Sequence, residues 1–230
     1  MIKKTLVILL LAAILAAAGL QGDSRRGVIP ENMPERLAAE MGKAISPYDD
    51  IFRAVGAEQG YDWRFISAIA YHESRFNPDI ISQQGAIGLM QIMPVVCRHF
   101  EVEEERITDP VTNVRLAGWL LSEIENMLGL PAGLPREERM GLVLAGYNCG
   151  VGHVKDARRL AKAAGENHNS WHVVVRYLEL KSLPEYYRRE EVRCGRFDGG
   201  RRTMAYVSEV MSKYRQYCSR VPDETDTPAE

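Results

Sequence analysis

The stretch WRFISAIAYHESRFNP, residues 63–78, contains a helical pattern that ends in an acidic residue. Its apolar side chains Ile66, Ile69 and Ala70 recur at the spacing of one helix face. The pair Asn77-Pro78 stops the pattern, because the residue before a proline avoids helical geometry. The stretch therefore predicts an amphipathic helix with one face in a hydrophobic core.

Glu73 lies near the end of this predicted helix, four positions after Ile69 and three after Ala70. It therefore projects from the face that packs into the core. Loss of hydration there raises the pKa of a carboxyl group toward neutrality, which suits a general acid. The alternative is an ordinary helix-terminal glutamate, satisfied by backbone groups or by Arg75. The helix alone leaves both interpretations open.

Helical periodicity continues through most of the chain. Further helices are expected over 46–60, from Asp109-Pro110 to Leu128, and over 137–148, 152–164, 171–181 and 203–218. Only residues 79–92 lack the pattern, and their Ser, Gly and Ile content suits a short irregular β-hairpin or loop. We therefore expect a mainly α fold.

Length and charge limit the class of protein. The chain has 230 residues, of which 46% are hydrophobic and 26% charged, as expected for one folded domain with terminal tails. Its 29 Lys and Arg residues and 31 Asp and Glu residues leave a formal net charge of −2, without a long basic block. This balance argues against nucleic acid as a partner.

The N-terminus has the pattern of a secretory signal, with two lysines, an apolar run and small residues after it. We expect a signal peptide at 1–20, a linker at 21–45, a folded domain at 46–218 and a disordered acidic tail at 219–230. The apolar run is too short to span a bilayer, so no stable membrane span is expected after cleavage. The predicted location is the periplasm or cell envelope.

Four cysteines, at positions 97, 149, 194 and 218, would be exported with the folded domain. Cys97 and Cys149 lie in apolar sequence and are interpreted as buried thiols. A Cys194–Cys218 disulfide is a hypothesis that rests on the even count and an oxidising compartment. No cysteine pairs with a histidine in a recognisable catalytic pattern.

Several spaced motifs resemble the catalytic domain of lytic transglycosylases of the soluble-lytic-transglycosylase type, and most closely the membrane-bound lytic transglycosylase F group. The resemblance covers about Ser46 to Tyr217. The motifs are Glu73-Ser74, Asn77-Pro78, Ser82, Gly85-Ala86, Gly88-Leu89-Met90-Gln91, Met93-Pro94, Ala145-Gly146-Tyr147-Asn148-Cys149-Gly150, Gly152-His153-Val154, Asp156-Ala157-Arg158, Trp171 and Tyr206-Val207. Motifs that occur together in this order are far more specific than any one of them.

The resemblance implies a lysozyme-like helical domain with an irregular hairpin or loop beside a substrate groove. Glu73 matches the catalytic glutamate of the family. The expected substrate-binding and supporting residues are Ser74, Ser82, Gln91, Tyr147, Asn148 and Tyr206. Simpler roles stay open for two of them, since Ser82 can cap a turn and Tyr206 can pack within the last helix. No cofactor or metal is implied, and His72-Glu73 lacks the second histidine of a zinc helix.

The implied reaction cleaves the β-1,4 bond between N-acetylmuramic acid and N-acetylglucosamine in peptidoglycan glycan strands and forms a 1,6-anhydro ring. One glutamate suffices for it, unlike the paired carboxylates of most glycosidases. The alternatives are a goose-type, lysozyme-like muramidase that uses water, and a non-catalytic peptidoglycan-binding or scaffold protein. Cell-envelope machinery that recruits the chain is a further expected partner.

Overall fold

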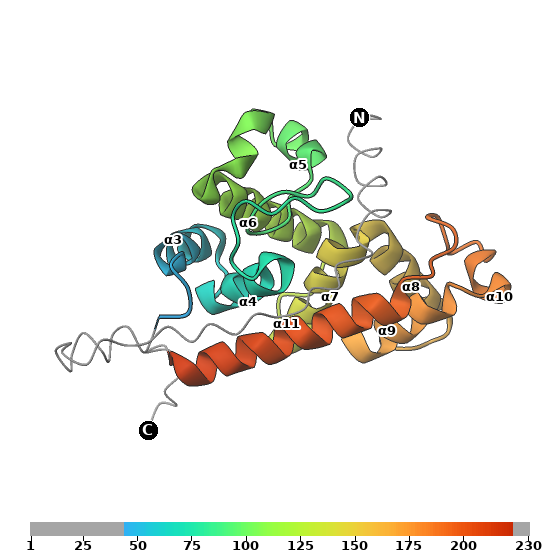
Figure 1. Ribbon diagram of the computed structural model, residues 1–230. Coiled ribbons are helices and arrows are strands. Elements are labelled where there is room, and N and C mark those ends of the chain that lie inside the picture. The colour runs from blue at the N-terminus through green and yellow to red at the C-terminus, as the bar shows by residue number, and fades with distance from the viewer. Residues whose placement is uncertain (1–43, 223–230) are drawn as a thin grey trace, which may run out of the picture.

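The computed structural model describes residues 44–222, which fold almost entirely into helices (Figure 1). In chain order the elements are α3 (Asp49–Gln59), α4 (Trp63–Ser74), α5 (Pro94–His99), the 3-10 helix η2 (Glu104–Thr108), α6 (Pro110–Leu128), α7 (Arg136–Cys149), α8 (Val151–Ala163), α9 (Trp171–Leu180), α10 (Pro184–Tyr187) and α11 (Gly200–Arg220). Isolated bridges pair Ile81 with Ile87 and Ile87 with Ile92. The mainly α expectation is confirmed, and 79–92 form an irregular loop with two bridges.

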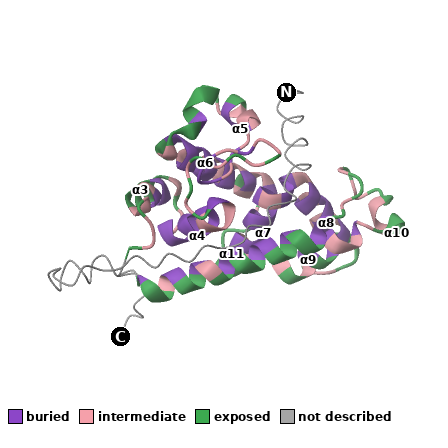
Figure 2. Cartoon of the chain, viewed as in Figure 1, coloured by how far each residue is buried: buried purple, intermediate pink, exposed green. Residues whose placement is uncertain are grey.

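The long helix α11 runs along one side of the molecule and packs against α4, α7 and α9 (Figure 1). Helix α4 also packs against α3, and α8 packs against α9. Buried residues line the inward faces of these helices, while the outer face of α11 is exposed (Figure 2). Phe65, Ile66 and Ile69 of α4 are 0% exposed, so this helix crosses the centre of the core.

Helix α4 has a defined beginning and end. The Asp62 carboxylate caps the first turn by accepting a hydrogen bond from the Arg64 backbone N–H, at 2.9 Å. At the other end Arg75 adopts the left-handed conformation, with φ of 54°, and its N–H donates to the carbonyl of Tyr71. This end turns the chain into the loop that carries residues 79–92.

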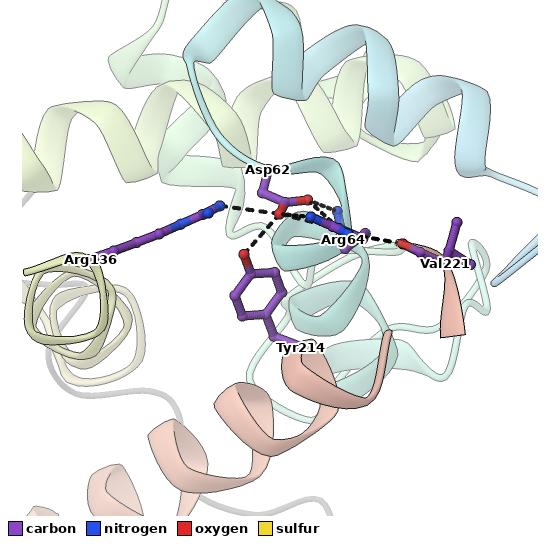
Figure 3. A network of polar contacts seen from close by, with 5 residues as sticks. All are labelled: Asp62, Arg64, Arg136, Tyr214 and Val221. Atoms are coloured by element: carbon purple, nitrogen blue, oxygen red, sulfur yellow. Dashed lines mark hydrogen bonds and ion pairs between the residues drawn. The ribbon is translucent and has the colours of Figure 1, made fainter. Parts of the chain in front are cut away.

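Asp62 also joins α4 to two other helices (Figure 3). Its carboxylate accepts hydrogen bonds from the Arg64 side chain at 2.7 Å, from Arg136 of α7 at 3.1 Å and from the Tyr214 hydroxyl of α11 at 2.8 Å. Arg64 in turn donates to the carbonyl of Val221 at 2.9 Å. The network fixes the start of α4 against the C-terminal half of α11.

Several predicted boundaries need correction. The helix expected over 46–60 begins at Asp49 instead, after a turn in which the Asp49 carboxylate accepts hydrogen bonds from the N–H groups of Ile45 and Ser46. The predicted tail starts too early, since α11 continues through Arg220 and Val221 is only 8% exposed. The short elements α5, η2 and α10 were not predicted.

All four cysteines are free thiols, and Cys97 and Cys149 are buried as expected. The hypothesised Cys194–Cys218 bridge is wrong. Cys194 lies against Gly152 of α8, whereas Cys218 is in the last turn of α11, a helix of 21 residues. A helix of that length extends about 30 Å, which separates the two thiols.

Three predicted segments lie wholly or partly outside the described residues. They are the signal peptide at 1–20, the linker at 21–45 except its last two positions, and the acidic tail beyond residue 222. Within 44–222, none of the helices is both long enough and apolar enough to cross a membrane.

Candidate active site

Glu73 lies in the last turn of α4 and faces α11. The Tyr206 hydroxyl donates a hydrogen bond to Glu73 Oε1, at 2.7 Å. Burial raises the pKa of Glu73 from its ordinary 4.5 to about 7, although the hydrogen bond from Tyr206 acts in the opposite direction. Near neutral pH the group therefore exists in both protonation states, as a single acid and base requires.

Arg75 does not neutralise Glu73, although the sequence left that alternative open. Its guanidinium lies over the Tyr71 ring, 4.2 Å from the centroid, and donates to the Tyr71 carbonyl at 3.3 Å. Within residues 44–222, the hydroxyl of Tyr206 is the one hydrogen-bond donor to the Glu73 side chain. Asp79, the next carboxylate along the chain, is exposed in a turn. Among the described residues, Glu73 thus has no cationic partner.

Ser74 and Tyr147 hold the loop backbone against the end of α4. The Ser74 hydroxyl contacts the carbonyls of Leu89 at 2.8 Å and Ala70 at 3.1 Å, and the Tyr147 hydroxyl donates to the Met90 carbonyl at 2.7 Å. Burial and the nearby charge of Glu73 raise the pKa of Tyr147 well above its ordinary value. Both residues therefore border the glutamate, but they bond to backbone rather than to its carboxylate.

Asn113 of α6 holds the same loop from the opposite side and was missed in the sequence. It is 1% exposed, accepts a hydrogen bond from the Met90 N–H at 2.8 Å, and donates to the carbonyls of Ile87 and Ile107 at 2.9 Å each. An added Cβ at Gly88 would lie 2.7 Å from Asn113 Nδ2, so this approach needs a glycine. The sequence offered one sign of this role, because Asn113 is a polar residue four positions after the Asp109 cap on a helix with apolar spacing.

Gln91 and Ser82 organise the loop internally. Gln91 has a φ of 47°, and its Nε2 donates to the carbonyls of Ile80 at 3.2 Å and Gly88 at 3.1 Å. Such strained backbone often occurs at functional sites. The Ser82 hydroxyl accepts a hydrogen bond from the Ala86 N–H at 2.9 Å, which is the turn-capping role that the sequence left open. Neither side chain forms a hydrogen bond with Glu73.

Asn148 connects the end of α7 to the first turn of α11. Its Oδ1 accepts a hydrogen bond from the Thr203 hydroxyl at 2.9 Å, and Thr203 is 1% exposed. Thr203 precedes Tyr206 by three residues, so it lies on the same side of α11. No described residue accepts a hydrogen bond from the Asn148 Nδ2.

His72 supports Tyr206 from the other side and was also missed as a site residue. The two rings meet edge to face, with centroids 4.7 Å apart and planes at 77°. The imidazole Nε2 lies 2.9 Å from Glu209 Oε2 of α11. Burial, the largest influence, lowers the pKa of His72 despite this carboxylate. Tyr206 is therefore held between Glu73 and the His72 ring.

A small pocket borders this cluster at Tyr147. Its other walls come from α5, α6, α7 and the start of α8, and they are mainly apolar. Glu73 does not line it. In the part of the chain from 44 to 222, no group of three or more His, Cys, Asp or Glu residues is placed to hold a metal ion.

Comparisons with known proteins agree with this arrangement. Residues 50–170 match the family described as the transglycosylase SLT domain. The membrane-bound lytic murein transglycosylase F of Alcanivorax borkumensis is 33% identical over 167 residues, which are 73% of this chain and 34% of that protein. The protein of the same name from Shewanella sediminis is 34% identical over 67% of this chain and 31% of its own length. The chain thus spans about a third of the length of these curated relatives.

Two solved structures share the fold. An inactive mutant of lytic transglycosylase Slt from Pseudomonas aeruginosa has a TM-score of 0.54 and 22% identity, and covers 78% of this chain and 26% of its own. The 70 kDa soluble lytic transglycosylase of Escherichia coli gives a TM-score of 0.52 at 22% identity. The match covers 78% of this chain and 25% of the Escherichia coli chain. The lysozyme-like architecture expected from the sequence is therefore confirmed.

Proposed function

This chain belongs to the transglycosylase SLT domain family, and on that premise we propose that it cuts the glycan strands of peptidoglycan as a lytic transglycosylase. The observation that carries the proposal is the state of Glu73. Burial raises its pKa to about 7, and a tyrosine hydroxyl rather than a cation is its partner. Such a carboxyl group can donate a proton and accept one back at the same pH.

Glu73 acts twice in the proposed reaction. As an acid it protonates the glycosidic oxygen, the bond from that oxygen to C1 of N-acetylmuramic acid breaks, and the 2-acetamido oxygen stabilises the positive charge at C1. As a carboxylate it then takes the proton of the C6 hydroxyl, whose oxygen bonds to C1 and closes the 1,6-anhydro ring. The carboxyl group ends protonated, and no water is consumed.

The surrounding residues have separate proposed roles. Tyr206 stabilises the carboxylate form through its 2.7 Å hydrogen bond, which favours the second half of the reaction. Ser74 and Tyr147 keep the carbonyls of the loop directed away from the glutamate by binding them. The free Nδ2 of Asn148 and the Oε1 of Gln91 are suited to hydroxyl and N-acetyl groups of the sugar. Ser82 contributes by shaping the loop.

Product analysis separates this reaction from the goose-type hydrolase alternative. The C6 hydroxyl has an intramolecular advantage, since effective molarities of such groups reach about 10⁵ M or more. Purified protein and peptidoglycan in H₂¹⁸O should release fragments that end in 1,6-anhydro-N-acetylmuramic acid, are one water lighter than lysozyme products and contain no ¹⁸O. Reducible ends that contain ¹⁸O would identify a hydrolase. Absence of cleavage would instead favour the non-catalytic binding protein.

Export to the cell envelope is part of the proposal. It is supported by the signal-like pattern of residues 1–20 and by the presence of the substrate in that compartment. N-terminal sequencing of the protein recovered from an osmotic-shock fraction should begin after Ala18 or Leu20. Recovery of the intact N-terminus in the cytoplasmic fraction would contradict export.

A further inference from the structure

A fully buried pair of opposite charges lies where α8 packs against α9 (Figure 1). Lys181, which follows the last residue of α9, and Asp156 of α8 are both 0% exposed, and the ammonium donates a hydrogen bond to the carboxylate at 2.6 Å. The same ammonium lies 2.8 Å from Nδ1 of His153, which must therefore be the acceptor nitrogen. The reaction proposed above uses none of these residues.

The Asp156 carboxylate holds the segment that leads into α11. It accepts hydrogen bonds from the backbone N–H groups of Arg193 and Cys194, at 2.9 Å each. Burial acts to raise the pKa of Asp156, but the bonds from the lysine and from these N–H groups lower it below its ordinary value. A buried carboxylate is costly without a cation. The buried ammonium therefore stabilises the carboxylate that holds this segment in place.

The same segment fixes the beginning of α11. The Phe197 N–H donates to the carbonyl of Lys181 at 3.2 Å, and the Phe197 ring stacks on His153 with centroids 4.4 Å apart. At Gly200, the first residue of α11, an added Cβ would lie 2.6 Å from the backbone of Glu179 in α9. The helix thus begins in close contact with α9, and the buried charges lie directly behind that contact.

Helix α11 connects this beginning to the candidate active site. Thr203, in its first turn, donates to Asn148 at 2.9 Å, and Tyr206 donates to Glu73 at 2.7 Å. Tyr206 is six residues after Gly200, which is about 9 Å along a helix. A shift or rotation at the start of α11 therefore moves both side chains, and a hydrogen bond of this length tolerates little displacement.

We propose that Lys181 is a positioning residue: through Asp156 it fixes the start of α11, and with it the hydroxyl group that bonds to Glu73. The inference rests on the proposed function, because that function is what gives this hydrogen bond its importance. An apolar side chain at position 181 should loosen residues 193–199 and let the first turns of α11 move. The hydrogen bond between Tyr206 and Glu73 is then formed in a smaller fraction of the molecules.

The test is the titration of the Glu73 carboxyl group, followed by NMR of ¹³C-labelled protein, because it needs no turnover. In Tyr206→Phe, which lacks the whole hydrogen bond, the midpoint should rise by about one pH unit, and in Lys181→Met by about half a unit. The double variant should rise no further than Tyr206→Phe alone, because the lysine acts through that hydroxyl. Cleavage by Lys181→Met should fall about threefold, with the alkaline limb of the pH–rate profile moved to higher pH.

A matched control is available at the other end of α11. Arg64 is 1% exposed, pairs with Asp62 at 2.7 Å and donates to the carbonyl of Val221. Arg64→Met also leaves a buried carboxylate without its buried cation, so it should lower the melting temperature by an amount similar to that in Lys181→Met. The midpoint of Glu73 should nevertheless stay at the wild-type value, because this change lies at the start of α4.

Two outcomes would overturn the positioning role. One is a folded Lys181→Met variant whose Glu73 midpoint equals that of wild type, and the other is an equal rise in Arg64→Met. If Lys181→Met does not fold, Phe197→Leu takes its place, since it loosens the same segment without leaving a buried charge unpaired. An unchanged midpoint in that variant would also overturn the proposal. Failure of the proposed function is distinguishable, because it is seen as absence of 1,6-anhydro ends with wild-type protein, whereas the titration is measured without substrate.

Discussion

Helix α4 has a carboxyl group at each end, and each accepts a hydrogen bond from a tyrosine of α11. Tyr214 donates to Asp62 at 2.8 Å, and Tyr206 donates to Glu73 at 2.7 Å. Their pKa values nevertheless move in opposite directions, since that of Asp62 is lowered and that of Glu73 is raised to about 7. One end of the helix is an anchor, and the other is a candidate acid.

The difference comes from the other partners rather than from burial. Burial acts to raise the pKa of Asp62, but hydrogen bonds from the Arg64 side chain, the Arg64 backbone and Tyr214 outweigh it. Within the described part of the chain, Glu73 receives only the hydrogen bond from Tyr206, so desolvation prevails. The helix dipole adds to the contrast, because it stabilises a carboxylate at the N-terminal end and disfavours one at the C-terminal end. The lack of a cationic partner among the described residues thus keeps the pKa of Glu73 high.

The largest effect is expected from Glu73→Gln, which keeps the shape of the side chain but cannot transfer a proton. Cleavage of peptidoglycan should fall by about 10⁴-fold or more, since one group performs both proton transfers. A zymogram and a quantitative muropeptide assay measure the loss. The matched control Glu137→Gln changes an exposed glutamate of α7 and should be fully active. A Glu73→Gln variant within about tenfold of wild type would assign the catalysis elsewhere.

The same variant has a predicted effect on stability. Because the folded pKa of Glu73 is above the unfolded value of 4.5, its contribution to stability is present below pH 4.5 and is lost as the pH rises to about 7. Glu73→Gln removes this loss, so its free energy of unfolding at pH 8 should exceed that of wild type by roughly 3 kcal/mol. Urea unfolding at pH 4 and pH 8 tests the sign.

Asp62→Asn should mainly destabilise the fold. Arg64 is 1% exposed, and removal of its charged partner costs about 3 kcal/mol. The folded pKa of Asp62 is lowered, so its contribution is present above pH 3.8 and is lost as the pH falls through the folded pKa. Urea unfolding should therefore show a smaller difference from wild type in acid than at pH 7. The control Arg136→Gln removes the exposed member of the network and should cost less than about 1 kcal/mol.

Tyr206→Phe should change the reaction more than the fold. Its hydroxyl lowers the pKa of Glu73, so removal of the hydroxyl should raise that pKa. The alkaline limb of the pH–rate profile should then move to higher pH. Loss of one hydrogen bond to a charged group predicts about a tenfold fall in kcat. A profile that keeps its alkaline limb in place would show that the hydroxyl does not influence Glu73.

Tyr214→Phe is the matched change at the other end of α4 and should have the smallest effect. Loss of its hydrogen bond to Asp62 should lower the free energy of unfolding by about 1 kcal/mol, because the arginines still pair with the carboxylate. The pH–rate profile should be that of wild type. A shift in that profile would mean that the two ends of α4 are coupled.

The long helices and the position of Glu73 could be predicted from the sequence. Features that depend on contacts between distant residues could not. The apolar spacing before Glu73 correctly placed it at the end of a core helix. Tyr206 is 133 residues from Glu73 along the chain, so its expected place in the site came from a family resemblance rather than from spacing. His72 acts on Tyr206 through a tertiary contact that no local pattern indicates. Asn113 was marked in the sequence only as an amide on a helix with apolar spacing, which does not reveal its contact with the loop.

The remaining errors are local. The elements α5, η2 and α10 have 6, 5 and 4 residues, too few to establish a helical period. The first helix begins three residues later than expected, because residues 46–48 form a turn closed by the Asp49 carboxylate and the Ser46 hydroxyl. The cysteine hypothesis used polarity and an even count, whereas the length of α11 determines the separation of Cys194 and Cys218.

The central claim is tested most directly by the titration of the two carboxyl groups in one molecule. Protein labelled with ¹³C at the Glu and Asp carboxyl carbons is followed by NMR from pH 3 to 9, with resonances assigned through Glu73→Gln and Asp62→Asn. The account predicts a midpoint of about 7 for Glu73, while the signal of Asp62 stays that of a carboxylate above pH 3.8. A Glu73 midpoint at or below its ordinary 4.5 would contradict the account.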